Sequence, residues 1–304
     1  PSPMYKSVSK GVGFHYDSTV GYLATSFRVS QTVVPHVLQR FEFWVFFALH
    51  LAIFFAYQRG IISDATNKKS VLFMDWNDMK AIAAITTFFE VFYTNQCFNR
   101  YVRLYSSSRH LLGLVHDFCF EVRLHLSAGS PPHAWLSARY TVLSAILFFH
   151  QVMDSADEGM WEDLVANDLL RPEDEKFLRQ LTKEQRCTVL IHWSAEVAKL
   201  GITKAQAEKN VMKSLVDKLL KIRWQQQEVA DTLKLPMPFQ YFHLLNVMIC
   251  MNLLLWAYVM GTTDSMFAPL VYYFCALIFM GMMELGSQLQ NPFGDDAVDF
   301  PVKA

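Results

Sequence analysis

Two long stretches without a charged residue limit most strongly what this chain can fold into. The first, FQYFHLLNVMICMNLLLWAYVMG, runs from Phe239 to Gly261 and contains no Asp, Glu, Lys or Arg. The second, SMFAPLVYYFCALIFMGMM, covers residues 265–283 and is also free of charge. Because about 20 apolar residues in a helix cross the hydrocarbon core of a bilayer, both stretches predict membrane-spanning helices.

The composition agrees with an integral membrane protein. Of the 304 residues, 52% are hydrophobic and only 18% are charged, below the roughly 25% of a typical soluble domain. The net charge of −1 does not suggest nucleic acid as a partner. The five cysteines have no CxxC spacing, so neither a disulfide framework nor a zinc site is predicted.

An apolar run from Phe41 to Tyr57 predicts a further span, and residues 79–104, MKAIAAITTFFEVFYTNQCFNRYVRL, predict another. One continuous helix over residues 79–104 would extend about 39 Å at 1.5 Å per residue, more than the ~30 Å hydrocarbon core. Glu90 and Asn95 stand where a lipid-facing helix would carry Leu. Polar groups at this depth usually face a bundle interior or a water-filled path. On this stretch alone, a buried helix of a soluble bundle is an equally good interpretation.

The segment between the second and third spans has a different character. It holds most of the charged residues of the chain, and its Leu and Ile recur at helical spacing. Ser130-Pro131-Pro132 predicts a break between two of its helices. We therefore expect an all-α fold, an integral membrane helical bundle with four transmembrane helices and an inserted soluble helical domain. The expected parts are an N-terminal segment (1–38), the first and second spans (39–104), the soluble domain (105–237), the third and fourth spans (238–287) and a C-terminal segment (288–304).

Two motifs resemble the bestrophin anion channels. ELGSQLQNPFGDDAVDF, Glu284 to Phe300, is similar to the end of the last bestrophin span, where an NPFG motif is followed by acidic residues. FYTNQCFNRY, Phe92 to Tyr101, is similar to the FRxNxxYxRF pattern of bacterial and plant bestrophins. The resemblance implies a bestrophin-like homopentamer with four membrane helices per subunit and a central pore lined by the second. It also implies a calcium clasp that joins the acidic run to the N-terminal stretch of a neighbouring subunit.

The resemblance places Phe88 in the neck of the pore, with Ala84 and Lys80 one and two helical turns earlier, where relatives have apolar residues. A register shifted by one residue instead places three others there: Phe89, Ile85 and Ala81. Packing of these aromatics between helices is a further interpretation. A hydrophobic constriction gates by dewetting, so the small Ala84 predicts a weaker barrier, and Lys80 would attract anions.

The resemblance also implies two further pore sites. Asn95 and Arg100 match the second motif, and their donors near the pore mouth would suit anions; structural capping is the alternative. Asn210 or Val211 falls at the constriction in the soluble domain, where relatives usually carry an apolar side chain. Asn210 would make that aperture more wettable, unless it is an ordinary exposed helix residue.

For the clasp, Asp296 and Asp299 match the two acids that supply side-chain oxygens. Calcium prefers six to eight hard oxygen ligands, so backbone carbonyls would complete the site. These would come from three places: Gln288, Asn291 and an N-terminal residue around Val20. Ala297 and Val298 interrupt the acidic run that relatives have, which thins the negative field around the pair. The alternative is a solvated acidic tail.

The function expected from this resemblance is a channel in a lipid membrane that passes chloride or bicarbonate, with calcium as a possible cofactor. The alternative is a structural bestrophin-fold subunit of a larger organellar membrane complex, with little or no channel activity. The departures at Lys80, Ala84 and Tyr93 keep this alternative open. The first residue, Pro1, and the likeness to plant and bacterial members favour an organellar membrane, thylakoid or mitochondrial inner, over the plasma membrane.

An enzyme is not expected. Five acidic and histidine residues invite a metal-enzyme interpretation: His116, Asp117, Glu121, His150 and Asp154. The repeated Glu-x-x-His pattern of a di-iron bundle is missing from the sequence.

Overall fold

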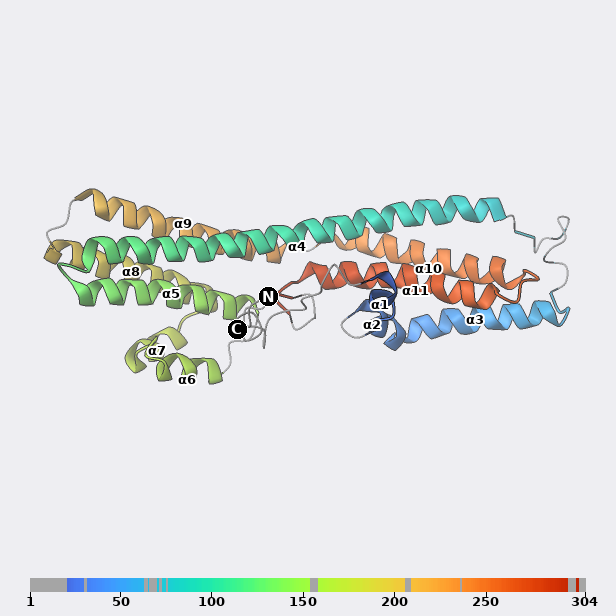
Figure 1. Ribbon diagram of the computed structural model, residues 1–304, viewed down its shortest axis with the longest axis horizontal. Helices are drawn as coiled ribbons and strands as arrows, with labels where there is room; N and C mark the ends of the chain where they lie inside the picture. Colours follow the sequence, from blue (N-terminus) through green and yellow to red (C-terminus); the bar gives the residue numbers. More distant parts are fainter. Residues whose placement is uncertain are drawn as a thin grey trace. The chain divides into compact units, whose positions relative to one another are not determined.

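A computed structural model describes residues 21–29, 32–62, 65, 70, 73–74, 76–153, 158–205, 209–235, 237–294 and 299–300. All the regular secondary structure in these residues is α-helical (Figure 1), which confirms the predicted all-α fold. In chain order the helices are α1 (Tyr22–Ser26), α2 (Val33–Gln39), α3 (Phe41–Gln58), α4 (Trp76–Leu126), α5 (Pro131–Val152), α6 (Glu158–Ala166), α7 (Pro172–Arg179), α8 (Lys183–Ala205), α9 (Lys209–Lys234), α10 (Phe239–Gly261) and α11 (Ala268–Gln290).

The chain divides into two compact units. Unit 1 comprises Pro1–Tyr101 and Pro236–Ala304, and unit 2 comprises Val102–Leu235. Helix α4 contributes residues to both units, because it continues for 51 residues without interruption. The sequence predicts a helix over residues 79–104 only. The helix is longer because no proline follows until Pro131, and a single internal glycine costs only about 1 kcal/mol.

Three helices of unit 1 are long and apolar enough to cross a membrane, namely α3, α10 and α11. They correspond to the predicted first, third and fourth spans. The predicted second span lies in α4, which does not reach the same apolarity within the described residues. Lys80, Glu90 and the polar residues after Thr94 lower its hydropathy. Its place as a span therefore stays a prediction.

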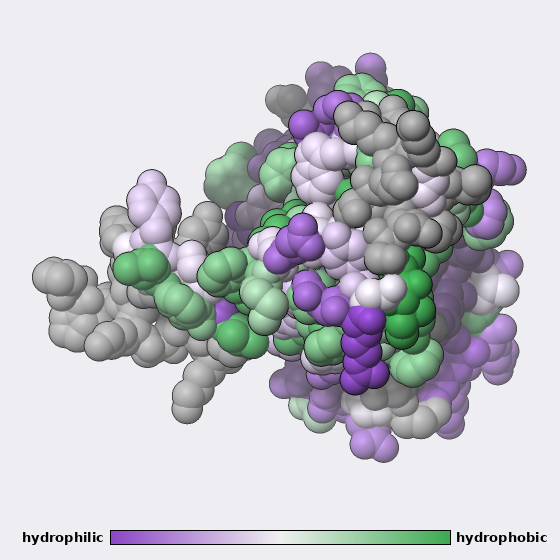
Figure 2. Space-filling model, turned by 90° about the vertical axis from the view of Figure 1, so that its right-hand side faces the viewer, coloured by the Kyte–Doolittle hydropathy of each residue, from purple (hydrophilic) through white to green (hydrophobic). Residues whose placement is uncertain are grey.

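Helix α10 is the central helix of unit 1. In the most apolar stretch of α10, 44% of the residues are buried inside the protein. The corresponding stretches of α3 and α11 are 17% and 22% buried. Large apolar side chains such as Phe55, Phe274 and Ile278 are therefore left exposed. Figure 2 shows apolar residues at the surface beside polar ones. A membrane protein can expose such residues because lipid or another subunit covers them.

The polar groups buried among the spans tie α3 and α11 to the backbone of α10. The imidazole of His50 stacks on the ring of Tyr272, with 4.4 Å between centroids, and its Nδ1 lies 3.0 Å from the carbonyl oxygen of Ala257. The Tyr272 hydroxyl donates to the carbonyl of Leu253 at 3.1 Å. Gly261 allows close approach of α3, since a Cβ there would lie 2.8 Å from Ile53 Cγ2.

In unit 2, helices α5 and α8 pack through small hydroxyl side chains. Ser137 Oγ donates to the carbonyl of Ser194 at 3.0 Å, and Ser194 Oγ donates to the carbonyl of Ser137 at 2.9 Å. Thr141 Oγ1 lies 2.8 Å from Ser194 Oγ, and all three side chains are fully buried. The helices can approach closely here because these polar groups satisfy one another.

We expect Ser194→Ala to lower the thermal midpoint of the full-length protein. The variant loses the hydrogen bonds of one buried hydroxyl, each worth about 0.5–1.5 kcal/mol net, while Ser137 and Thr141 keep their bonds to backbone carbonyls. Each kcal/mol shifts the midpoint of a domain of this size by about 2–4 °C. Thr188→Ala is the matched control, because that hydroxyl is exposed and bonds to the carbonyl of Glu184 in its own helix. Equal midpoints for the two variants would show that the hydroxyl cluster adds no stability.

Candidate functional site

One face of α4 carries the three residues of the first predicted neck register. Lys80, Ala84 and Phe88 follow one another at one-turn spacing, and all three side chains are exposed. Phe88 is the most conspicuous, because 67% of this large aromatic residue is exposed. The face is therefore free to meet water, lipid or another subunit.

The alternative register contains one residue that is held inside unit 1. Ala81 and Ile85 are exposed, but Phe89 is partly buried against the core of the unit. Its ring centroid lies 6.5 Å from that of Tyr241, and the Tyr241 hydroxyl donates to the Phe89 carbonyl at 3.1 Å. Of the two neighbouring aromatics, only Phe88 lies on the open face. Its role in a pore stays a prediction.

A second group of residues joins α4 to the end of α11. Tyr93 is fully buried, and its hydroxyl accepts a hydrogen bond from the side-chain amide of Gln290. Its ring packs on Gly286, where a Cβ would lie only 2.7 Å from the ring. Arg100 Nε donates to the carbonyl of Gln290 at 3.1 Å. No local pattern in the sequence indicates this connection, because its partners are almost 200 residues apart.

Arg100 thus caps a helix end, where a cation is favourable because it meets the negative end of the helix dipole. This geometry supports the capping interpretation of Arg100. Asn95, the other residue predicted at the pore mouth, is exposed. Of the two, Asn95 is therefore the side chain that remains available to an ion.

The NPFG motif forms a turn directly after α11. The amide of Phe293 lies 3.4 Å from Asn291 Oδ1, and the amide of Phe300 donates to the carbonyl of Pro292 at 2.9 Å. The Phe300 ring lies 5.2 Å from that of Phe293 and 5.0 Å from that of Tyr101. These contacts fold the described end of the chain back onto unit 1.

Two of the predicted calcium ligands gather around Gly294 of this turn. A Cβ on Gly294 would lie 3.0 Å from Asp299 Oδ2 and 3.9 Å from the carbonyl oxygen of Asn291. Asp299 is only 9% exposed. Gln288 lies one turn earlier in α11 and donates from Nε2 to Glu284 Oε1 at 3.4 Å.

These donors are hard oxygens, which fit calcium chemically. Asp296 and Val20 lie outside the described residues, and so do Ala297 and Val298. The described part of the chain contains no group of three or more His, Cys, Asp and Glu residues that could hold a metal ion.

The residues predicted at the soluble constriction lie in unit 2 at the start of α9. Asn210 is exposed and Val211 is half-buried. Glu121 of α4, considered above for a metal enzyme, instead pairs with α9. Ser214 Oγ donates to Glu121 Oε1, and Lys218 Nζ lies 3.1 Å from Glu121 Oε2.

Burial opposes ionisation of Glu121, but the hydrogen bonds from Ser214 and Lys218 outweigh it and hold its pKa below the ordinary 4.5. The stabilisation is therefore present above about pH 4.5 and is lost as the pH falls through the lower pKa of the folded state. We expect Glu121→Gln to lower the thermal midpoint at pH 7 and to match the wild type below that pKa. Glu196→Gln is the control, since this carboxylate is exposed and its partner, His192, lies on the same helix. A Glu121→Gln deficit that persists unchanged at low pH would contradict this assignment.

The family model of bacterial and fungal bestrophins matches residues 17–304. This chain belongs to the bestrophin family. The bestrophin membership agrees with the resemblance found in the NPFG motif and in residues 92–101. It supports an integral membrane protein, and the bestrophin family is known as a family of ion channels.

Solved bestrophin structures share the fold. A crystal structure of a bacterial bestrophin homologue from Klebsiella pneumoniae, in a point-mutant form, aligns with a TM-score of 0.74 at 16% identity, covering 86% of this chain and 93% of that chain. A structure of the homologue from the same organism, phased by zinc SAD, aligns with a TM-score of 0.69 at 16% identity, covering 86% of this chain and 92% of that chain. No curated relative matches the chain. Because the matched family model describes bacterial and fungal members, the predicted preference for an organellar membrane gains no support.

Proposed function

We propose that this bestrophin is the subunit of a homopentameric anion channel that passes chloride or bicarbonate by passive diffusion. The exposed face of α4 carries the proposal, because it presents Phe88 at a one-turn spacing from Ala84 and Lys80. Five copies of this face around an axis would form an aromatic ring with a small residue and a cation beside it. The ring would resist ions by dewetting, and the cations would favour anions.

The test is the assembly and the flux of purified protein. In mild detergent the protein should have the mass of five subunits, and in liposomes it should release chloride and bicarbonate down their gradients. A monomeric protein, or a pentamer without anion flux, would contradict the proposed channel function. Flux of cations at equal rates would overturn the role of Lys80.

The second candidate is a structural subunit of a larger membrane complex. Tyr93 favours it, because the family pattern often has arginine here, whereas this tyrosine is buried and bonded to Gln290 within the subunit. Isolation from native membranes separates the candidates. Symmetric assemblies of this chain alone support the channel, and single copies held among unrelated proteins support the structural subunit.

We further propose that calcium binds between the NPFG turn and a neighbouring subunit. Asp299 would supply a carboxylate and Asn291 a carbonyl oxygen, and Asp296 would supply the second carboxylate. Asp296→Ala and Asp299→Asn should each abolish any calcium dependence of the anion flux. Asp264→Asn is the control, as its carboxylate lies beyond α10 and accepts from the Tyr57 hydroxyl. Identical calcium titrations for both clasp variants and the wild type would contradict the site.

A further inference from the structure

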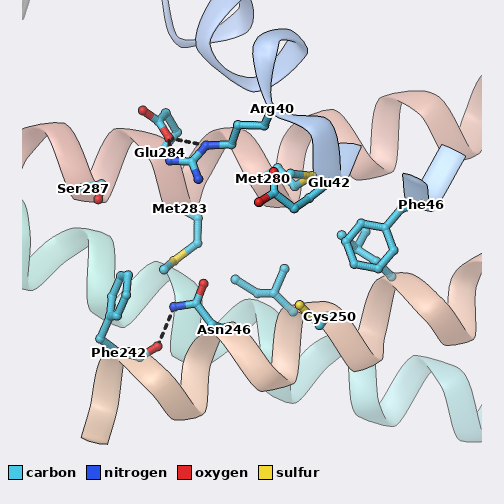
Figure 3. A pocket seen from close by; sticks show the side chains of 12 residues that line it. Arg40, Glu42, Phe46, Phe242, Asn246, Cys250, Met280, Met283, Glu284 and Ser287 are labelled. Atoms are coloured by element: carbon cyan, nitrogen blue, oxygen red, sulfur yellow. Dashed lines mark hydrogen bonds and ion pairs between the residues drawn. The ribbon is translucent and has the colours of Figure 1, made fainter. Parts of the chain in front are cut away.

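A cavity of about 300 Å³ opens between α3, α10 and α11 within unit 1 (Figure 3). This volume is at the lower end of the range of small-molecule sites. One part of its wall is apolar, with Phe46 from α3 and Met280 and Met283 from α11. The other part is polar and lies beside the first turn of α3. The cavity is therefore amphipathic.

The polar part of the wall carries an excess of negative charge. Arg40 Nε donates to Glu284 Oε2 at 2.9 Å, and Figure 3 shows Arg40 reaching from the start of α3 to Glu284 on α11. This ion pair neutralises both groups. Glu42 is the third charged residue of the wall, and its side chain is exposed. Within the described part of the chain it has no ion-pair partner. One positive and two negative charges leave one carboxylate uncompensated.

One of the neutral polar side chains of the wall, Asn246, also offers an acceptor. The side-chain nitrogen of Asn246 donates to the carbonyl of Phe242 in its own helix at 2.7 Å. Its side-chain oxygen points away from that bond and toward Met283 in Figure 3. The apolar wall suits an aliphatic tail, because its unbranched methionine side chains adapt to the shape of what they pack against.

We propose that this cavity binds an amphiphilic organic cation, a protonated amine with an apolar tail. The ammonium group pairs with Glu42 and donates to the Asn246 oxygen, and the tail lies between Phe46, Met280 and Met283. Because α3 begins at Phe41, Glu42 lies in the first turn of a span, at the depth where charged headgroups meet the hydrocarbon. An anionic ligand is disfavoured, because Arg40, the cation of the wall, already forms an ion pair with Glu284. The proposal does not depend on channel activity.

The free thiol of Cys250 lines the cavity and is exposed, so it serves as the reporter. Full-length protein in lipid nanodiscs is alkylated with N-ethylmaleimide, and the rate at each cysteine is measured by peptide mass spectrometry. Three probes with the same tail are compared: decylammonium, decanoate and decanol. We expect decylammonium alone to slow alkylation of Cys250 at least fivefold. Cys275 does not line the cavity, and its rate should stay unchanged.

The variants test the headgroup contact. Glu42→Gln should abolish the protection by decylammonium, whereas Asp264→Asn, an equal change of charge beyond the other end of α10, should retain it. Rates are compared with and without probe in each variant, because thiol reactivity depends on nearby charge and the substitution removes one from the cavity wall. Equal protection by decanoate or decanol would show a site that selects tails rather than cations. That result would overturn the proposal, and so would full protection in Glu42→Gln. A Cys250 thiol that resists alkylation, or one that decylammonium does not protect, would overturn it as well.

Discussion

Phe88→Ala is expected to raise the anion conductance of the reconstituted channel by about an order of magnitude. Phe88 is 67% exposed on α4, and the residue one turn earlier is the small Ala84. In the proposed pore a single aromatic ring per subunit would then form the narrow part of the neck. Removing it replaces a dewetting constriction by a wider, wettable one. A barrier lowered by about 1.4 kcal/mol corresponds to a tenfold rate.

Phe89→Ala is the matched control for this experiment, because it removes the same side chain from the next position. The Phe89 ring packs against the core of unit 1 beside Tyr241. Its loss should lower thermal stability, toward the lower end of the roughly 3–5 kcal/mol of buried phenylalanine truncations, and leave the conductance of folded channels unchanged. Conductance that rises in Phe89→Ala and not in Phe88→Ala would establish the shifted register. If neither variant conducts, the structural-subunit candidate replaces the channel.

The membrane helices α3, α10 and α11 could be predicted from sequence because their signal is local. A long run without charge has few outcomes other than a buried or lipid-facing helix. The break before α5 was equally visible, since Pro131 and Pro132 cannot continue a helix but suit its first turn. The full length of α4 was not visible, because its second half has no long apolar run.

The candidate site was only partly accessible from sequence. Phe88 and Phe89 are identical neighbours, so no pattern in the chain distinguishes the exposed ring from the packed one. Tyr241 decides between them, and it lies 152 residues from Phe89. The link between Tyr93, Gly286 and Gln290 is likewise tertiary. Local motifs identify candidate residues, but contacts between distant helices determine which face each one occupies.

Lys80→Glu is expected to produce the second large effect, a severalfold fall in the anion-to-cation permeability ratio. Lys80 is exposed on the same face of α4 as Phe88, two turns away. A unit charge 4 Å from an ion is worth about 1 kcal/mol in bulk water and about 4 kcal/mol at the lower effective dielectric of a protein surface. In a pentamer the substitution reverses five such charges. The face of α4 would then attract cations instead of anions.

Reversal potentials measured in salt gradients across planar bilayers test this prediction. The permeability ratio should fall in the order wild type, Lys80→Gln, Lys80→Glu, because the first variant removes the charge and the second inverts it. The differences should shrink at high ionic strength, where the Debye length falls from about 10 Å at 0.1 M to about 3 Å at 1 M. Lys199→Glu, an exposed position on α8, carries the same change of charge outside α4 and should leave the ratio unaltered. Equal ratios in Lys80→Glu and Lys199→Glu would place Lys80 away from the ion path, and the proposed pore would then have to be lined by another face of α4.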